Sequence, residues 1–220
     1  GLMFIAIVPA YNESKRITHV IESLTPHVDQ VVVIDDGSSD DTAAKAASAG
    51  AVVLVHPINL GQGAALETGH VYARIKNADV VLHFDGDGQF DTDDIRKAKK
   101  LLDSGVDVVL GSRFLGVSSS IPWFKRRIIL PIARLVNQLF TGIKLTDAHN
   151  GFRMLGRRGL EQIKLTHNRM SHATEIIALI KKNNLTYIEI PVTVTYHEYG
   201  QKVSGGFAII KDLIINKFIN

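Results

Sequence analysis

The stretch DVVLHFDGDGQFD, residues 79–91, joins an apolar run to a cluster of acidic and amide side chains. Its Val- and Leu-rich part predicts a strand over 79–85 that is buried on both faces, as in a parallel sheet. Asp85 and Asp87 are two residues apart, so in an extended chain they lie on the same side. Together with the amide of Gln89 they offer the oxygen ligands that Mg²⁺ or Mn²⁺ prefers. Because Asp–Gly pairs are also common in turns, this stretch alone leaves a metal site and a plain turn equally open.

Similar apolar runs elsewhere in the first half predict the rest of a sheet. They are rich in Val and Ile, and they cover residues 4–10, 31–36, 51–56 and 107–112. The helices predicted between these runs begin near Asn12, near Asp41, after Gly63 and at Asp93, all residues that can cap a helix. Strands that alternate with helices indicate an α/β fold with a mostly parallel central sheet flanked by helices.

Polar side chains follow the predicted strands at their carboxyl ends. These residues are Tyr11, Glu13, Asp35, Asp36, Asp85, Asp87 and Arg113. Open α/β sheets bind ligands at the edge where the carboxyl ends of their strands meet. Strand ends that point polar groups the same way therefore predict a binding site at this edge.

The second half of the chain is less regular, and its predicted helices are amphipathic. We expect helices over 123–142, 166–183 and 205–220, and an extended segment over 186–200. Neither a linker nor an internal repeat separates the two halves. The whole chain, residues 1–220, is therefore predicted to form a single domain.

Composition limits the chemistry of the protein. The chain has 220 residues and no cysteine, which excludes disulfides, thiolate metal ligands and a cysteine nucleophile. The net charge of +3 hides an asymmetry, because residues 1–110 carry 9 basic and 16 acidic side chains whereas residues 111–220 carry 16 basic and 6 acidic ones. An acidic half can hold a cation, and a basic half can face the phosphates of a nucleotide or of a membrane surface.

The sequence has no segment typical of export or of a membrane span. The apolar start MFIAIVPA lacks a basic leader, and no run reaches the roughly 18 uncharged apolar residues of a transmembrane helix. We therefore expect a cytoplasmic protein. Residues 123–127 read WFKRR, so the helix over 123–142 is either a membrane-docking helix or a core helix with a solvated basic face.

Six motifs occur in an order that resembles a known enzyme family. They are IVPAYNES (7–14), VVVIDDGSSDDT (31–42), NLGQGAALETG (59–69), DGDGQFD (85–91), GSR (111–113) and TDAHNGFR (146–153). The order and spacing resemble those of family 2 glycosyltransferases of the GT-A fold, and most of all the dolichol- or polyprenyl-phosphate sugar transferases. The resemblance covers residues 3–205, and it implies a nucleotide-sugar-binding half over 3–112 and an acceptor-binding half over 113–220.

The resemblance implies which residues bind the donor, a UDP- or GDP-sugar. Pro9, Tyr11 and Glu13 are expected to line the pocket for the base and the ribose. Asp36 is expected to contact the base or the ribose. The alternative is that Asp35 and Asp36 only cap the turn that follows their strand.

The diphosphate of the donor is expected at the acidic strand end and at a helix start. Free backbone N–H groups at such a start favour a polar or anionic ligand, and arginine suits phosphate. The residues implied are Gly61, Gly63 and Ala64 at the helix start, Asp85, Asp87 and Gln89 as ligands of Mg²⁺ or Mn²⁺, and Arg113 on phosphate.

The motif TDAHNGFR matches the one that faces the acceptor in the family. Asp147 is then the base that deprotonates an acceptor hydroxyl, or, if the acceptor is a lipid phosphate that is already an anion, it mainly positions other groups. Arg153 is implied to bind acceptor phosphate, unless Asp147 caps a turn and Arg153 pairs with it. The late segment YHEYGQKVSG resembles a loop that closes over the diphosphate, with Lys202 and Ser204 as candidates.

The function expected from the resemblance is metal-dependent, inverting transfer of a sugar to a polyprenyl phosphate, either undecaprenyl or dolichyl. The catalytic residues would be Asp87, Asp147 and Arg113. The alternatives are transfer to a saccharide hydroxyl in cell-envelope polysaccharide synthesis and a non-catalytic nucleotide-sugar-binding subunit of a membrane complex. We expect the protein at the cytoplasmic face of the membrane, docked on the lipid surface or on a small membrane protein, and we expect no nucleic-acid partner.

Overall fold

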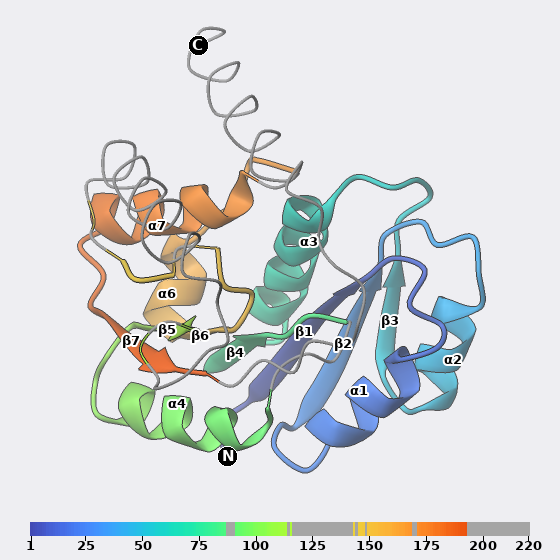
Figure 1. Cartoon of the computed structure of the whole chain (residues 1–220), viewed down its shortest axis with the longest axis horizontal. Helices are drawn as coiled ribbons and strands as arrows, with labels where there is room; N and C mark the ends of the chain where they lie inside the picture. The colour runs from blue at the N-terminus through green and yellow to red at the C-terminus, as the bar shows by residue number, and fades with distance from the viewer. Residues whose placement is uncertain are drawn as a thin grey trace, which may run out of the picture.

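Seven strands form one sheet in the computed structural model (Figure 1). The structure describes residues 1–86, 91–113, 115, 143, 145–147, 149–168 and 171–192. In this part of the chain the strand order is β3-β2-β1-β4-β6-β5-β7. The strands are β1 Phe4–Ala10, β2 Gln30–Asp35, β3 Val52–Val55, β4 Val80–His83, β5 Val108–Ser112, β6 Arg153–Gly156 and β7 Tyr187–Pro191.

The sheet is parallel except for β6, which runs antiparallel to β4 and to β5. The predicted α/β fold with a mostly parallel sheet is thus confirmed. Strand β6 was not predicted, because RMLG is too short an apolar run to indicate a strand. Its direction matters for the site, since it pairs Arg153 with His83 of β4 and with Leu110 of β5. The amino end of β6 therefore lies at the edge where the other strands have their carboxyl ends.

Helices cover both faces of the sheet (Figure 1). They are α1 Ile17–Leu24, α2 Thr42–Ser48, α3 Gln62–Ile75, α4 Asp93–Asp103, α6 Arg157–Gln162 and α7 His172–Lys182. Apolar side chains of α1, α2 and α4 fill the core on one face, and those of α3, α6 and α7 fill the core on the other. Strand β1 alternates between the two cores, with Ala6 and Val8 on one side and Ile5 and Ile7 on the other. This double burial explains why the predicted strands are apolar at consecutive positions.

Helix α1 begins later than the sequence indicated because Asn12 belongs to a turn. Asn12 has a φ of +56°, in the left-handed region. Its backbone N–H donates to Ser38 Oγ at 2.9 Å, and its side-chain oxygen accepts a hydrogen bond from the N–H of Ser39 at 2.9 Å. Asn12 therefore ties the end of β1 to the loop after β2, and the helix starts only at Ile17.

The predicted helix over 166–183 also begins later, at His172. Glu175, in the first turn of α7, accepts hydrogen bonds from the backbone N–H groups of Thr166 and His167 at 2.8 and 2.9 Å, so the segment before the helix is held as a loop. The extended segment predicted over 186–200 is confirmed as β7 only as far as Pro191.

Two predicted helices, over 123–142 and 205–220, lie outside the described residues. Lys202 and Ser204, which lie between these two helices, are outside the described residues as well. The docking role expected of the first helix and the loop-closing role expected of these two residues therefore stay predictions. Within the ranges that the structure describes, we find no helix long and apolar enough to cross a membrane.

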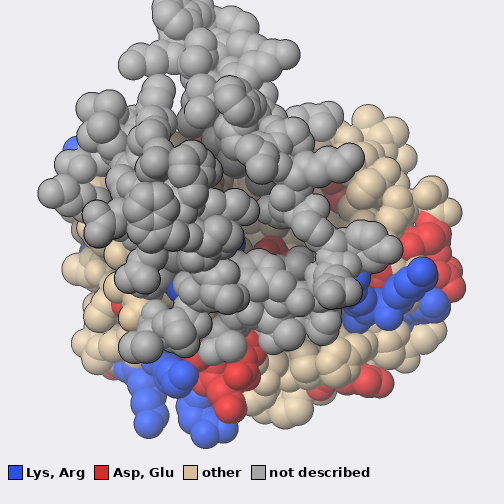
Figure 2. All heavy atoms as spheres, in the orientation of Figure 1, with Lys and Arg blue, Asp and Glu red and all other residues tan. Residues whose placement is uncertain are grey.

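Side chains of both charges gather over α4 on the face shown in Figure 2. Two ion pairs within this helix join Lys97 to Asp94 and Lys99 to Asp103. The acidic residues of this part of the first half are thus balanced by lysines of the same helix.

Candidate active site

Asp85 lies just after β4, at the carboxyl edge of the sheet. Gln62, the first residue of α3, donates from its side-chain Nε2 to Asp85 Oδ1 at 2.9 Å. Two glycines make room for this turn. A Cβ at Gly151 would lie 2.1 Å from Asp85 Oδ2, and a Cβ at Gly86 would lie 2.9 Å from the carbonyl oxygen of Pro9. The carboxylate is therefore held between α3 and the chain just before β6.

A divalent cation at this edge needs more ligands than Asp85. The other two predicted ligands, Asp87 and Gln89, lie outside the described residues. Among the residues that are described, no three His, Asp or Glu side chains cluster as a metal site. Asp85 itself fits a hard cation, because it supplies carboxylate oxygens from a fixed position. The three-residue metal site stays a prediction.

Arg113 and Asp147 form a two-point ion pair at the same edge. Arg113 Nε donates to Asp147 Oδ2 at 2.7 Å, its Nη2 donates to Oδ1 at 2.8 Å, and its backbone N–H adds a bond at 3.1 Å. Asn150 donates to the same carboxylate at 3.2 Å. Burial by itself raises the pKa of the Asp147 carboxyl, but the bonds from Arg113 and Asn150 outweigh burial and hold this pKa below its ordinary value. The ion-pair partner of Asp147 is thus Arg113, and the alternative that Arg153 pairs with it is wrong.

Arg153 is a buried cation near two carboxylates. It is 3% exposed at the start of β6. Within the described part of the chain its guanidinium has neither a hydrogen bond nor an ion pair, and Asp85 and Asp147 act on it only through their charge. Burial lowers the pKa of Arg153 to about 10, and the two carboxylates partly offset this shift. The guanidinium therefore stays charged at neutral pH in a place where a buried cation requires an anionic partner.

The carboxylate of Asp36 accepts hydrogen bonds from residues of the loop before α3. Its Oδ1 lies 2.7 Å from His56 Nδ1 and accepts a hydrogen bond from the N–H of Leu60 at 2.9 Å, while its Oδ2 accepts one from the N–H of Gly61 at 2.7 Å. The other ring nitrogen of His56 lies 2.8 Å from Thr68 Oγ1 of α3. Asp36 thus fixes this loop, and its contact with the base or ribose stays a prediction.

The start of α3 does not offer the free N–H groups that the sequence indicated. The N–H of Gly61 binds the carboxylate just described, and the N–H groups of Gly63 and Ala64 both donate to the carbonyl oxygen of Asn168, at 2.8 and 3.2 Å. A Cβ at Gly63 would lie 1.9 Å from the carbonyl oxygen of His167, so glycine permits this close approach. The prediction of free N–H groups is therefore wrong for Gly61, which Asp36 binds, and for Gly63 and Ala64, which a loop distant in sequence covers. Donor binding by these residues through other atoms stays a prediction.

The residues predicted to surround the base lie at the end of β1 and just beyond it. Pro9 is in β1, and the side chain of Tyr11 after it is half exposed. The N–H of Glu13 donates to Thr42 Oγ1 at 2.9 Å, and its carboxylate pairs with Arg16 at 3.3 Å. These residues are thus neighbours along the chain, at the end of β1 and in the loop after it, and their contact with a nucleotide stays a prediction.

Three residues that shape the site were not predicted from the sequence. Glu189 in β7 accepts hydrogen bonds from the N–H and the hydroxyl of Thr146, both at 2.9 Å, so it holds the loop that carries Asp147. The other two are His56 and Asn168, which fix the loop before α3 and the start of that helix. Glu189 could have been noticed because it is the charged residue inside the otherwise apolar strand YIEIP. Nothing in the sequence marks His56 or Asn168.

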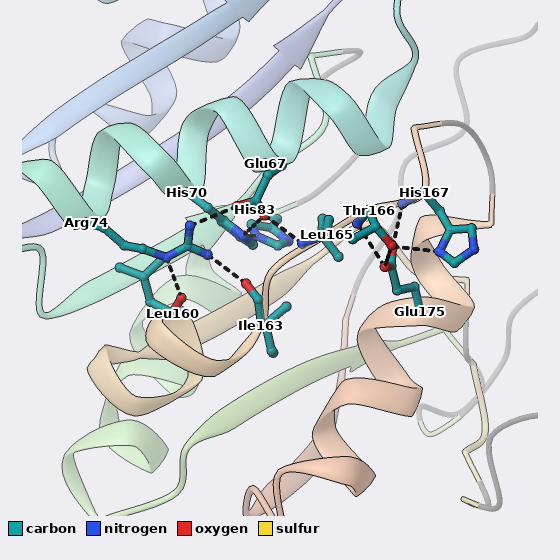
Figure 3. Close-up of polar contacts among 10 residues, drawn as sticks. All are labelled: Glu67, His70, Arg74, His83, Leu160, Ile163, Leu165, Thr166, His167 and Glu175. Carbon is teal, nitrogen blue, oxygen red and sulfur yellow. Dashed lines mark hydrogen bonds and ion pairs between the residues drawn. The ribbon is translucent and has the colours of Figure 1, made fainter.

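A polar network on α3 connects this helix to the segment after α6 (Figure 3). Arg74 donates to the carbonyl oxygen of Ile163 at 2.9 Å and to Glu67 Oε1 at 2.8 Å, and Glu67 Oε2 accepts a hydrogen bond from the N–H of Leu165 at 2.7 Å. Burial by itself raises the pKa of Glu67, but the nearby His70 ring and the hydrogen bonds from Arg74 and from the N–H of Leu165 outweigh burial and lower this pKa to about 2. Glu67 is therefore ionised in the folded protein at neutral pH.

The substitution Glu67→Gln is expected to lower the free energy of unfolding at pH 7 by about 3 kcal/mol at most. The pKa of Glu67 in the folded protein, about 2, lies below its ordinary value of 4.5. Its stabilising effect is thus complete above about pH 4.5 and is lost as the pH falls towards 2. Urea unfolding should show the difference between wild type and variant shrinking to about half at pH 3. Equal differences at both pH values would contradict this assignment, and the exposed Glu22→Gln on α1 is the control.

Comparison with known proteins identifies the family. The family described as "Glycosyl transferase family 2" matches residues 5–164. The chain therefore belongs to glycosyl transferase family 2, and the protein is a glycosyltransferase.

Two relatives match most of the chain. One, 30% identical, is the UDP-N-acetylglucosamine–dolichyl-phosphate N-acetylglucosaminyltransferase of Methanococcus voltae, and the match covers 96% of this chain and 94% of that protein. Another, 27% identical, is the polyprenol monophosphomannose synthase of Mycolicibacterium smegmatis, and the match covers 91% of this chain and 81% of that protein. The predicted likeness to the polyprenyl-phosphate sugar transferases is confirmed.

The solved structures confirm the predicted GT-A fold. Glucosyl-3-phosphoglycerate synthase of Mycobacterium tuberculosis, in complex with Mg²⁺ and UDP, superimposes with a TM-score of 0.72 at 21% identity. The match covers 97% of this chain and 77% of that one. Another structure of the same synthase contains Mn²⁺ with UDP and its glucosylated product.

Proposed function

We propose that this enzyme transfers a sugar from a UDP- or GDP-sugar to a polyprenyl phosphate, with a divalent metal ion and with inversion at the anomeric carbon. The observation that carries the proposal is the state of Asp147. Its carboxylate is bound at two points by Arg113, and its pKa lies below the ordinary value. A good general base has a pKa near the working pH, so Asp147 is poorly suited to deprotonate a sugar hydroxyl.

A phosphate acceptor needs no such base, because it is already an anion. In the proposed reaction a phosphate oxygen of the acceptor forms a bond to the anomeric carbon. The bond from that carbon to the β-phosphate oxygen breaks, and the nucleoside diphosphate leaves from the opposite face. Arg153, a buried cation without a partner of its own in the described residues, is the proposed site of the acceptor phosphate.

The donor diphosphate is proposed to lie at the acidic turn after β4. Asp85, Asp87 and Gln89 would hold Mg²⁺ or Mn²⁺, which when bound neutralises the diphosphate as it leaves. Arg113 lies at the same edge and is about one-third exposed, with its fork already oriented by Asp147. It can therefore face a donor phosphate while it remains paired. The metal-bound nucleotides in related structures support the metal, and the names of the relatives support the acceptor.

The proposed acceptor requires contact with a membrane. A polyprenyl chain stays in the bilayer, so the acceptor edge of the enzyme must reach the lipid surface. We place the enzyme at the cytoplasmic face, where nucleotide sugars are available, docked on lipid or on a small membrane protein. The excess of basic residues in the second half of the sequence supports docking on anionic lipid.

Asp147→Asn separates the two classes of acceptor. If the acceptor is a phosphate, kcat should fall by less than about tenfold, because only the orientation of Arg113 is disturbed, whereas loss of a true base costs about 10²- to 10⁴-fold. The measurement is steady-state transfer to undecaprenyl phosphate. The matched control is Asp107→Asn, which breaks an aspartate–arginine pair with Arg158 that is not at the site. A fall in kcat of more than about 100-fold in Asp147→Asn but not in Asp107→Asn, with an unchanged unfolding temperature, would favour a hydroxyl acceptor.

A further inference from the structure

Two neighbouring contacts join the end of β5 to the loop that carries Asp147. The first is the ion pair between Arg113 and Asp147, with side-chain hydrogen bonds of 2.7 and 2.8 Å. The second joins the two residues that directly precede them, Ser112 and Thr146, whose hydroxyl oxygens lie 2.5 Å apart. Because the two contacts are adjacent along both segments, a shift of Thr146 would move Asp147 and, with it, the guanidinium of Arg113.

Glu189 anchors this loop to a third segment, strand β7. Its Oε1 accepts hydrogen bonds from the N–H and the hydroxyl of Thr146, both at 2.9 Å, and from the N–H of Asp147 at 3.3 Å. Its Oε2 accepts from the same N–H of Thr146 at 3.1 Å. Strand β7 is itself paired with β5, and the N–H of Val192 just after β7 donates to the carbonyl oxygen of Ser112 at 3.0 Å. The carboxylate therefore holds the loop from a fixed strand.

The hydroxyl groups of this chain can point in only one direction. A carboxylate oxygen accepts, so the hydroxyl of Thr146 donates its single proton to Glu189. The oxygen of Thr146 must then accept the proton of the Ser112 hydroxyl, which is fully buried. An apolar side chain at position 189 would remove the acceptor of two Thr146 donors at once and would leave both hydroxyl groups without a fixed direction.

The position of this loop sets the orientation of Arg113. A guanidinium has five N–H donors, and the pair with Asp147 uses two of them. The side chain of Arg113 is 32% exposed and that of Asp147 is 3% exposed, so the guanidinium is the member of the pair that a substrate can reach. Because a two-point pair fixes the plane of the guanidinium, the carboxylate also fixes the direction of its other N–H groups.

We propose that Glu189 and Thr146 are positioning residues, which hold Asp147 so that the Arg113 guanidinium is oriented for the diphosphate of the donor. The inference rests on the proposed function at one point, the contact of Arg113 with a donor phosphate. It extends that function to two residues that act only through the ion pair.

A matched pair of variants at position 189 tests the role by nucleotide binding, without any turnover. Glu189→Gln keeps an acceptor oxygen, whereas Glu189→Met has a similar length and no acceptor. The affinity of the full chain for UDP and for GDP, measured by calorimetry with Mn²⁺, should fall about tenfold in Glu189→Met and no more than about threefold in Glu189→Gln. Glu161→Met, an exposed glutamate of α6, is the control and should bind as the wild type does.

A double-mutant cycle distinguishes positioning from a general structural effect. Arg113→Met should itself weaken nucleotide binding by about tenfold or more. Addition of Glu189→Met to this variant should then weaken binding by less than about twofold, because the group that Glu189 positions is already gone. A further tenfold loss in the double variant would overturn the positioning role.

Thr146→Val and Thr146→Ser test the same chain with Glu189 in place. Serine keeps the hydroxyl between Ser112 and Glu189, whereas valine has the shape of threonine without it. Nucleotide affinity should fall about fivefold in Thr146→Val and stay within about twofold in Thr146→Ser. Equal affinities in these two variants, equal losses in the two variants at position 189, or a wild type that binds neither nucleotide would overturn the inference.

The outcomes separate this inference from the function on which it rests. The expected pattern of nucleotide binding in an enzyme that transfers no sugar to any polyprenyl phosphate would support the positioning role and refute the proposed function. Transfer to polyprenyl phosphate by the wild type, without the expected pattern in the variants, would refute the positioning role alone.

Discussion

Asp85→Asn is expected to lower kcat/KM for sugar transfer by about 10³-fold, because a metal-held charge at this position is worth several kcal/mol. Asparagine has the same shape, so it keeps the contact with Gln62 and the packing against Gly151. It removes the negative charge that a divalent cation requires and that partly offsets the burial of Arg153. The main effect is therefore expected on chemistry and metal affinity, and the thermal unfolding temperature should fall only by the small amount that the charge of Asp85 contributes beside Arg153.

The measurement is steady-state transfer at increasing Mn²⁺ concentration. The matched control is Asp79→Asn, an aspartate that precedes β4 at its other end and pairs with Arg157. It should retain wild-type activity. If Asp85→Asn keeps more than about a tenth of the wild-type rate at saturating metal, the metal does not bind at Asp85.

Arg153→Met is expected to lower kcat/KM for the acceptor by at least about 100-fold without lowering stability. The wild-type guanidinium is 3% exposed and has no hydrogen bond or ion pair in the described residues, so an apolar side chain of similar length removes a desolvation cost. Asp85 and Asp147 do not lose a hydrogen bond, since they bind Gln62 and Arg113. The unfolding temperature should thus stay the same or rise while transfer fails.

The comparison with Arg157→Met sharpens this test. Arg157 is the next arginine along the chain, at the start of α6. Its side chain is half exposed and forms an ion pair with Asp79. Its replacement should leave transfer unchanged. Unimpaired transfer by Arg153→Met would place the acceptor phosphate elsewhere, and a large drop in its unfolding temperature would make Arg153 a structural residue.

The parallel part of the sheet could be predicted from the sequence because its strands are buried on both faces. The runs over 4–10, 31–36 and 107–112 are apolar at consecutive positions, and each becomes a strand within a residue or two of its predicted ends. Strand β6 could not be predicted, since the short segment RMLG forms a strand only because it pairs with β4 and β5. Its prediction would have required knowledge of contacts between distant segments.

The site residues could be predicted by type, whereas their partners could not. The sequence places Arg113 at a strand end, and the family resemblance implies that Asp147 and Arg153 face the acceptor. Only the fold shows which arginine pairs with the aspartate. The start of α3 shows the same limit, because the carbonyl oxygen of Asn168 reaches it from far along the chain. The buried His70–His83 pair is a further case, since neither histidine stands out from the chain's nine.

The measurement that tests the central claim most directly is a transfer assay with the full chain. Radiolabelled UDP-glucose, UDP-N-acetylglucosamine, UDP-galactose and GDP-mannose would each be incubated with Mn²⁺ and undecaprenyl phosphate, with Asp87→Ala as the inactive control. The account predicts that label from one donor enters the organic phase, that this requires metal, and that the control shows none. Nucleotide binding with metal but without labelled lipid from any donor, together with transfer to a saccharide acceptor, would contradict it.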